Sequence, residues 1–237
     1  MKIKFIHIVF IIFISLKISA VIFANYINGL NITSISSSDI SSNSYNFISL
    51  DSIYNQLKLS KLISDSIVVK SIDLGKIESK ILEIPYIDEV LSFIDIESNF
   101  KLEIIEKKPI IDLKDYDFIL SNKGEIIPRI NDLSLSIKSF FGKVDSVTFG
   151  DLAKLGNYIS NDNFFINHIN YIYSDSTSFY FSVNNFDYYV KLGDLNQFEN
   201  KLKNYKGFYA AKVNNDFLQN FNNLNLNFNN QVIAQKK

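Results

Sequence analysis

The hydrophobic pattern begins with an almost wholly apolar run from Phe5 to Ala24. Twenty helical residues span about 30 Å, the thickness of the hydrocarbon core of a bilayer. We therefore predict a membrane anchor over residues 5–24, behind a short cytoplasmic N-terminus of residues 1–4. A lysine at the centre of a span costs about 3 kcal/mol, but Lys17 lies toward one end, where its ammonium group can reach the interface. The predicted anchor residues include Phe5, Ile12, Lys17 and Ile22.

The charges around this run predict its orientation. Lys2 and Lys4 precede it, and no charge follows it from Asn25 to Asn31. The positive-inside rule then places the N-terminus in the cytoplasm and the rest of the chain outside. A cleavable signal peptide is the alternative, with Phe5–Leu16 as its apolar region and Ala20 or Ala24 as small residues for processing.

Behind the anchor, the pattern predicts two helices. Ser49 is a candidate N-cap for a helix that runs to about Leu59. Asp73 caps a second helix, in which Leu74, Ile77 and Ile81 recur at helical spacing, and Pro85 stops it.

Two strands follow, at Tyr86–Ile94 and Phe100–Glu106; in the second, apolar residues alternate with Lys101 and Glu103. The Ser- and Asn-rich stretch Asn31–Asn46 is either a linker or a polar strand with a loop. With a first strand near Leu30, this order predicts a small α+β domain over residues 25–108, of which residues 25–46 are linker plus first strand.

From Pro109 to Lys237 the pattern predicts a mainly antiparallel β domain with flanking helices. Asn122-Lys123-Gly124 is typical of a hairpin turn, and so is Asn184-Asn185. Asp151 and Asp194 are candidate N-caps of two helices, the second with Leu195, Phe198, Leu202 and Tyr205 turned inward. A final strand is expected at about Leu224–Ala234, where Leu224, Leu226 and Phe228 alternate with asparagines. The predicted fold class is α+β, with an N-terminal transmembrane helix.

Composition excludes several function classes. The 237 residues contain no cysteine, which excludes disulfides, thiolate zinc sites and cysteine nucleophiles. The net charge of −1 gives no basic footprint for nucleic acid.

Candidate catalytic and metal-binding residues are few. His168 is the one histidine outside the anchor. Asp162 and Asp175 lie near it in sequence, but no nucleophile elbow accompanies them, and we interpret His168 as a surface residue in Asn-rich surroundings. Glu103 and Glu106 lie on opposite faces of one strand, so they cannot converge as a glycosidase pair. Asp112, Asp115 and Asp117 lack the glycine and glutamate of a calcium-binding EF loop. We expect no enzyme, metal, cofactor or small-molecule substrate.

Four segments carry a familiar pattern: Ile84-Pro85-Tyr86-Ile87, Glu106-Lys107-Lys108-Pro109, Val190-Lys191-Leu192-Gly193-Asp194-Leu195, and Leu226-Asn227-Phe228-Asn229-Asn230-Gln231-Val232-Ile233-Ala234. In this order they resemble the bacterial cell-division family FtsQ (DivIB). The resemblance implies that the first extracytoplasmic domain is a POTRA domain and the second is the family's β domain. It also implies a non-enzymatic divisome scaffold in the bacterial inner membrane, at the division septum, with FtsB- and FtsL-like partners.

The resemblance assigns roles to two groups of residues. Pro85, Glu106 and Pro109 are expected to be structural junctions. An edge strand can take up an extended peptide, and the family's partner-binding strand matches the final segment here. We expect Phe228 to support this strand from below and Asn230, Val232 and Ile233 to meet the partner. The expected partner-binding residues are Leu226, Phe228, Asn230, Gln231, Val232, Ile233 and Ala234.

Three other hypotheses stay open at this point. The final strand can be a plain edge closed off by Lys236 and Lys237. The chain can be another POTRA-bearing membrane protein, such as a chaperone-like assembly factor. It can also be a secreted lipid- or sugar-binding enzyme, which the scarcity of histidine disfavours.

Overall fold

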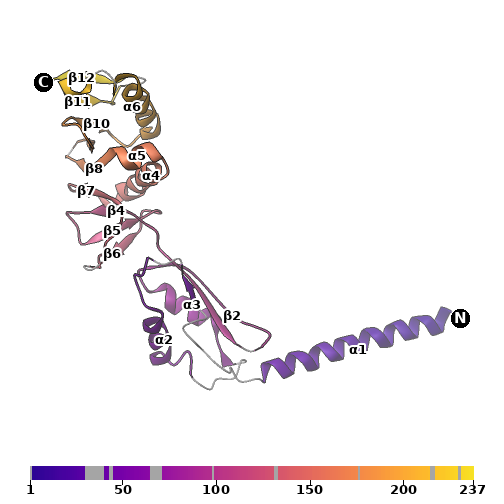
Figure 1. The fold of residues 1–237 in the computed structure, drawn as a ribbon. Coiled ribbons are helices and arrows are strands. Elements are labelled where there is room, and N and C mark those ends of the chain that lie inside the picture. Colours follow the sequence, from indigo (N-terminus) through magenta and orange to yellow (C-terminus); the bar gives the residue numbers. More distant parts are fainter. Residues whose placement is uncertain are drawn as a thin grey trace. The chain divides into compact units, whose positions relative to one another are not determined.

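The computed structural model describes residues 2–29, 40–42, 45–64, 71–97, 99–130, 133–175, 177–213, 217–228 and 231–237. The chain divides into two compact units, Met1–Glu106 and Lys107–Lys237. Figure 1 shows both units in ribbon form.

Helix α1 (Lys2–Asn28) contains the apolar run. From His7 to Tyr26 it has a mean hydropathy of 2.4, and none of this window is buried against other parts of the chain. Its length and composition are sufficient to cross a membrane. Ile12 and Ile22 are exposed, and the Lys17 ammonium lies 4.9 Å from the centre of the Phe13 ring. The side chain of Phe5 lies outside the described residues.

The rest of the first unit packs two helices against a three-stranded sheet of order β1-β3-β2. Strands β1 and β3 are parallel, and β2 and β3 are antiparallel. The core contains side chains from both helices and from β2 and β3. The elements are β1 (Ile40–Ser42), α2 (Leu50–Leu59), α3 (Leu74–Leu82), β2 (Ile87–Ile94) and β3 (Phe100–Glu106).

The two predicted helix starts are confirmed. The Ser49 side chain accepts the backbone N–H of Ser52, and the Asp73 carboxylate accepts that of Lys76. Each side chain therefore satisfies one N–H that has no partner within its helix. The strand expected near Leu30 lies outside the described residues; β1 lies further along the chain.

The second unit is built on a nine-stranded sheet of order β12-β11-β10-β9-β8-β7-β4-β5-β6. The pairings β4–β7, β7–β8 and β10–β11 are parallel, and the others are antiparallel. The strands are β4 (Pro109–Leu113), β5 (Phe118–Ser121), β6 (Ile126–Pro128), β7 (Lys138–Phe141), β8 (Ile169–Ser174), β9 (Phe179–Val183), β10 (Tyr189–Gly193), β11 (Phe221–Asn225) and β12 (Ile233–Lys236).

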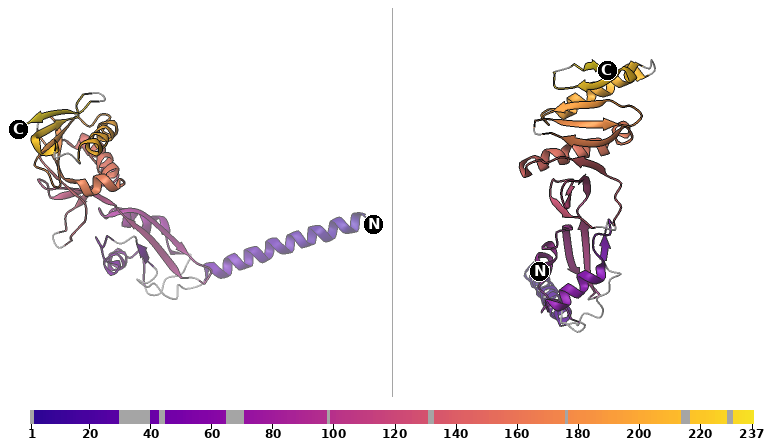
Figure 2. Two further views of the ribbon diagram at one scale, coloured as in Figure 1. Left: turned by 45° about the horizontal axis from the view of Figure 1, so that its top comes forward. Right: turned by 90° about the vertical axis from the view of Figure 1, so that its left-hand side faces the viewer.

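Helices gather on one side of this sheet, as Figure 2 shows. One continuous core lies between them and the strands, centred on residues such as Phe140, Phe165 and Tyr205. The helices are η3 (Ser146–Thr148), α4 (Phe149–Ser160), α5 (Asn163–His168), α6 (Phe198–Lys212) and η5 (Phe217–Asn220). The α+β fold class with an N-terminal apolar helix is confirmed.

Three predictions in this unit are wrong: the N-cap of α4, the N-cap of α6 and the length of the turn after β9. Helix α4 begins at Phe149 because a 3₁₀ turn runs directly into it, and Asp151 lies in its first turn. Asp194 does not cap α6; its carboxylate accepts the Asn196 N–H and pairs with Lys201, whereas α6 begins after Gln197, which has a φ of 51°. The turn after β9 is longer than two residues, because β10 starts only at Tyr189.

The Asn122-Lys123-Gly124 turn is confirmed. It joins β5 to β6, and Gly124 has a φ of 83°. A side chain there would also collide with the next helix, since a Cβ would lie 2.9 Å from the Gly150 Cα. Glycine is therefore required on both grounds.

Candidate partner-binding edge

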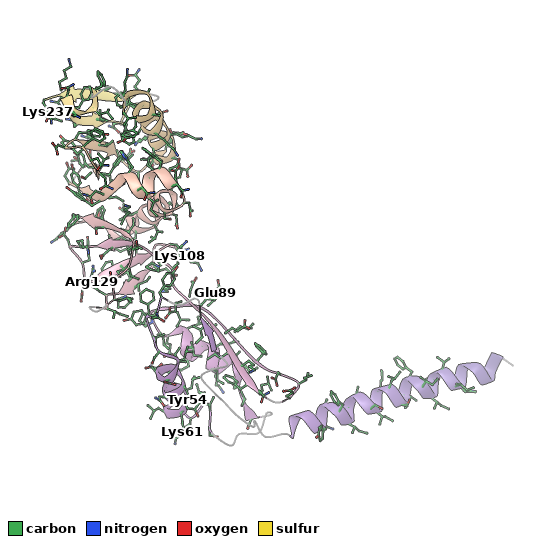
Figure 3. All side chains as sticks on the ribbon, in the orientation of Figure 1. Tyr54, Lys61, Glu89, Lys108, Arg129 and Lys237 are labelled. Carbon is green, nitrogen blue, oxygen red and sulfur yellow. The ribbon has the colours of Figure 1, made fainter. Side chains whose placement is uncertain are left out.

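Strand β12 lies at the end of the nine-stranded sheet and pairs with β11 alone. In this antiparallel pair, Ala234 lies opposite Leu224 and Ile233 lies opposite Asn225. No strand of the described chain lies on the other side of β12. Its backbone N–H and C=O groups on that side are therefore available to another chain. Figure 3 labels Lys237, which follows β12.

The backbone phase of β12 follows from one hydrogen bond. The N–H of Lys237 donates to the carbonyl of Asn220, 3.0 Å away, and so points toward β11. Backbone groups of successive residues in a strand point to opposite sides. Ile233 and Gln235 therefore direct their N–H groups at β11, while Ala234 and Lys236 direct theirs at the open side.

The side chains of β12 alternate between the core and solvent. Val232, just ahead of the strand, and Ala234 pack against the core. Ile233 is 44% exposed, and Gln235 accepts a hydrogen bond from the Asn223 side chain at 2.6 Å. The strand is thus fixed to the sheet through one face and one edge, and its other edge is open.

The predicted single strand over Leu224–Ala234 is wrong, because the chain forms a hairpin there. Leu226 is buried, and its N–H donates to the Lys191 carbonyl at 2.9 Å, but the chain then leaves the sheet. Phe228 is 49% exposed and lies outside both strands, so it does not support β12 from below. Gln231 is exposed before β12, and Asn230 lies outside the described residues.

Gly193, the last residue of β10, lies in close contact with the hairpin that β11 and β12 form. This residue has a φ of 76°, and a Cβ on it would lie 2.4 Å from the Asn227 side-chain oxygen. The end of β10 and the start of the β11–β12 turn therefore contact each other closely. This contact requires glycine at position 193.

The free edge of β2 in the first unit differs from that of β12. The Glu78 carboxylate, on α3, accepts the backbone N–H of Ser92 at 2.7 Å and its hydroxyl at 3.0 Å. A side chain that binds an edge N–H prevents another strand from pairing there. Within the described residues, no side chain covers β12 in this way.

The family comparison matches the unit that contains this edge. The family model described as FtsQ/DivIB, C-terminal related, matches residues 108–235, more than half of the chain. The chain belongs to the FtsQ/DivIB family. A search of curated proteins found no match. Family membership supports a role associated with the divisome, and the apolar helix α1 fits a single-pass inner-membrane protein.

In this FtsQ/DivIB chain, Glu106 has a role that the sequence reasoning missed. It is 2% exposed, and its carboxylate accepts the backbone N–H groups of Tyr45, Phe47 and Ile48 at 2.8, 3.0 and 3.2 Å. The segment that leads into α2 is therefore attached to the end of β3. Strand parity could have indicated this burial, since Glu106 shares its face with Leu102 and Ile104.

The two prolines expected at junctions lie at the ends of elements. Pro85 lies in the turn between α3 and β2, where the Ile87 N–H donates to the Ile84 carbonyl at 3.1 Å. Pro109 is the first residue of β4, a position where a missing N–H is tolerated.

His168 is not at the surface, so the interpretation from sequence is wrong. It is 7% exposed at the end of α5, and its Nε2 lies 2.6 Å from the Tyr205 hydroxyl, which contacts the Tyr188 hydroxyl at 2.9 Å. Burial lowers the pKa of His168 to about 4, so the ring is neutral at pH 7. These contacts are typical of a histidine in a hydrophobic core, with a hydrogen-bond partner for its Nε2.

The aspartates near His168 in sequence have other partners. Asp162 caps α5 by accepting the Phe164 N–H, and it pairs with Lys206 at 2.7 Å. Asp175 accepts the Thr177 N–H and the Tyr180 hydroxyl, which lowers the pKa of its carboxyl. Neither carboxylate is hydrogen-bonded to His168.

Two of the three aspartates weighed as calcium ligands, Asp112 and Asp115, have other partners. Asp112 pairs with Arg129 at 2.6 Å and with Lys114, and these two cations lower the pKa of its carboxyl against the effect of burial. Asp115 accepts the Gly142 N–H. In the part of the chain that the structure describes, no three metal-ligating side chains converge.

Proposed function

We propose that this chain is a membrane-anchored, non-enzymatic scaffold of the divisome that binds FtsB- and FtsL-like partners outside the membrane. Membership in the FtsQ/DivIB family supports the role as a divisome scaffold, since the family is of scaffold type. The open edge of β12 is the observation that carries the binding role.

The partner adds an extended strand to β12. The N–H groups of Ala234 and Lys236 supply the main-chain hydrogen bonds, which give affinity in strand addition. The exposed side chains of Ile233 and Gln235 lie on the solvent face and set the register of the added strand.

The other expected residues take different parts in this proposal. Val232 and Ala234 hold β12 against the core, and the buried Leu226 anchors the hairpin. Phe228 and Gln231 lie in or beside the hairpin turn, where a partner side chain can reach them. Asn230, outside the described residues, stays a proposed contact of the partner.

The anchor and the first unit complete the proposal. Helix α1 is retained in the inner membrane, with Lys2 and Lys4 on the cytoplasmic side and the chain that follows the helix outside, at the septum. Within the first unit, the order strand, helix, helix, strand, strand supports its assignment as a POTRA domain. The proposed domain boundary falls near Lys108.

Co-purification from cells tests this function. The tagged full chain should bring down FtsB- and FtsL-like proteins from detergent-solubilised membranes, and a fluorescent fusion should gather at division sites. Ala234→Pro, which removes one of the proposed donors, should reduce partner recovery at least tenfold while the protein stays folded. Wild-type recovery by the folded Ala234→Pro variant, or a fusion that is spread evenly over the membrane, would contradict the proposal.

A further inference from the structure

Lys138 is a half-buried cation at the start of β7, on the side of the sheet that the helices cover. Residues two apart in a strand share a face, and Phe140 is fully buried in the core. Lys138 therefore points toward the helix layer rather than to solvent. Desolvation there lowers the pKa of its ammonium group.

The surroundings of Lys138 form a cavity of about 260 Å³. Its walls come from β4, from the segment before β7, and from α4 and α5. They combine aliphatic side chains with small polar ones; the lining residues are Ile110, Ser136, Ile137, Lys138, Gly156, Ser160, Ile166 and Asn167.

Gly156 allows α4 to pack closely on β4 at the wall of this cavity. A Cβ at this position would lie 2.8 Å from a carbon of Ile111 and 3.1 Å from one of Ile110. Any larger residue would push α4 away from β4 or fill the region between them. The cavity thus depends on close packing between this helix and the sheet.

Lys138 differs from three other partly buried cations of the second unit, each of which pairs with a carboxylate. Lys107 pairs with Glu125 at 3.0 Å, Lys201 with Asp194 at 2.7 Å and Arg129 with Asp112 at 2.6 Å. Among the described residues, no carboxylate lies within ion-pair distance of Lys138. Its ammonium group donates to the Ile169 carbonyl at 2.5 Å.

The Lys138 ammonium group therefore has N–H donors that the Ile169 carbonyl does not use. A lysine ammonium carries three N–H groups, and the Ile169 carbonyl takes one. Removing an ion from water without a counter-charge is costly. An anion in the cavity would supply that charge, and the isoleucine side chains would contact whatever carries it.

We propose that Lys138 and this cavity bind a carboxylate carried on a short aliphatic group. The ammonium group pairs with the carboxylate, Ser136 donates a hydroxyl, and Ile110, Ile137 and Ile166 contact the alkyl part. The carboxylate comes either from a free small acid or from the C-terminus of a peptide. This site is separate from the β12 edge and does not depend on the scaffold function.

Thermal unfolding of the full chain in detergent tests the site at constant ionic strength. The probes are propionate, its neutral counterpart propionamide, acetyl-alanine and acetyl-alaninamide. At least one of the two acids should raise Tm with saturation, and the two amides should not. A response to propionate alone indicates a free acid, whereas a stronger response to acetyl-alanine indicates a peptide C-terminus. Equal responses to acids and amides, or no response to either acid, overturn the proposal.

Two variants and a labelling measurement assign the effect to Lys138. Lys138→Met should abolish the response, and Lys143→Met, at an exposed lysine, should leave it unchanged. If Lys138→Met does not fold, amine-reactive labelling of the wild type replaces it. Propionate should slow the labelling of Lys138 at least threefold and leave that of Lys143 unchanged. An unchanged labelling rate at Lys138, or a full Tm response in Lys138→Met, overturns the proposal.

Discussion

One carboxylate oxygen of Glu106 accepts the backbone N–H of Phe47 at 3.0 Å, and so connects the end of β3 to a segment 59 residues earlier in the chain. The same side chain accepts the N–H groups of Tyr45 and Ile48. Hydrogen bonds to a buried charged group contribute about 1.5–3 kcal/mol each, and their loss leaves the N–H groups unsatisfied.

We therefore predict that Glu106→Ala lowers the free energy of unfolding by about 3 kcal/mol. Denaturant titration of the full chain in detergent, followed by circular dichroism, measures the change. Glu103→Ala on the same strand is the matched control, because Glu103 is exposed; its effect should stay below about 0.5 kcal/mol. Equal stabilities of the two variants would show that Glu106 contributes nothing beyond an ordinary surface residue.

Burial of His168 predicts a loss of stability in acid. Its pKa is lowered from 6.5 to about 4 in the folded protein, so the unfolded chain binds the proton more strongly. Stability is complete above pH 6.5 and falls as the pH drops toward 4, by on the order of 2 kcal/mol. The free energy of unfolding at pH 7.5, 5.5 and 4.5 measures this slope. His168→Phe should reduce the loss of stability between pH 7.5 and pH 4.5. An equal loss in that variant and in the wild type would show that His168 does not cause it.

Removing the Glu78 carboxylate should expose the edge of β2. In Glu78→Ala, the Ser92 N–H loses its acceptor, which costs about 1–3 kcal/mol of stability. The uncovered strand should also pair between molecules and raise the apparent mass in light scattering. Glu89→Ala, an exposed position on the same strand, is the control. A monodisperse Glu78→Ala variant would show that the carboxylate does not protect this edge.

Local signals in the sequence were sufficient for much of the fold. Ser49 and Asp73 predicted two helix starts, and Asn122-Lys123-Gly124 predicted a turn, because a cap or a positive φ depends on neighbouring residues alone. Apolar alternation predicted β3.

Tertiary contacts decided the features that sequence reasoning missed. Alternation of Leu224 and Leu226 continues to Phe228 in the sequence, but the chain turns away at Asn227, beside Gly193. The burial of His168 depends on Tyr205, which is 37 residues away. The hydrophobic periodicity of a short stretch of sequence does not show which residues far apart in the chain will contact each other.

The central claim is that the open side of β12 captures a partner strand, and two proline variants test it. Ala234→Pro removes an N–H that points to the open side, whereas Gln235→Pro removes one that points to β11. Ala234→Ser keeps the N–H and is the matched control. Each full-length variant is compared with the wild type for its Tm and for its recovery of FtsB- and FtsL-like proteins from solubilised membranes.

Ala234→Pro should keep its Tm within a few degrees of the wild type and lose at least nine-tenths of partner recovery. Gln235→Pro should lower Tm, and Ala234→Ser should match the wild type in both measurements. The decisive measurement is partner recovery by folded Ala234→Pro: near-complete loss is the predicted result, and recovery at the wild-type level would contradict docking at β12.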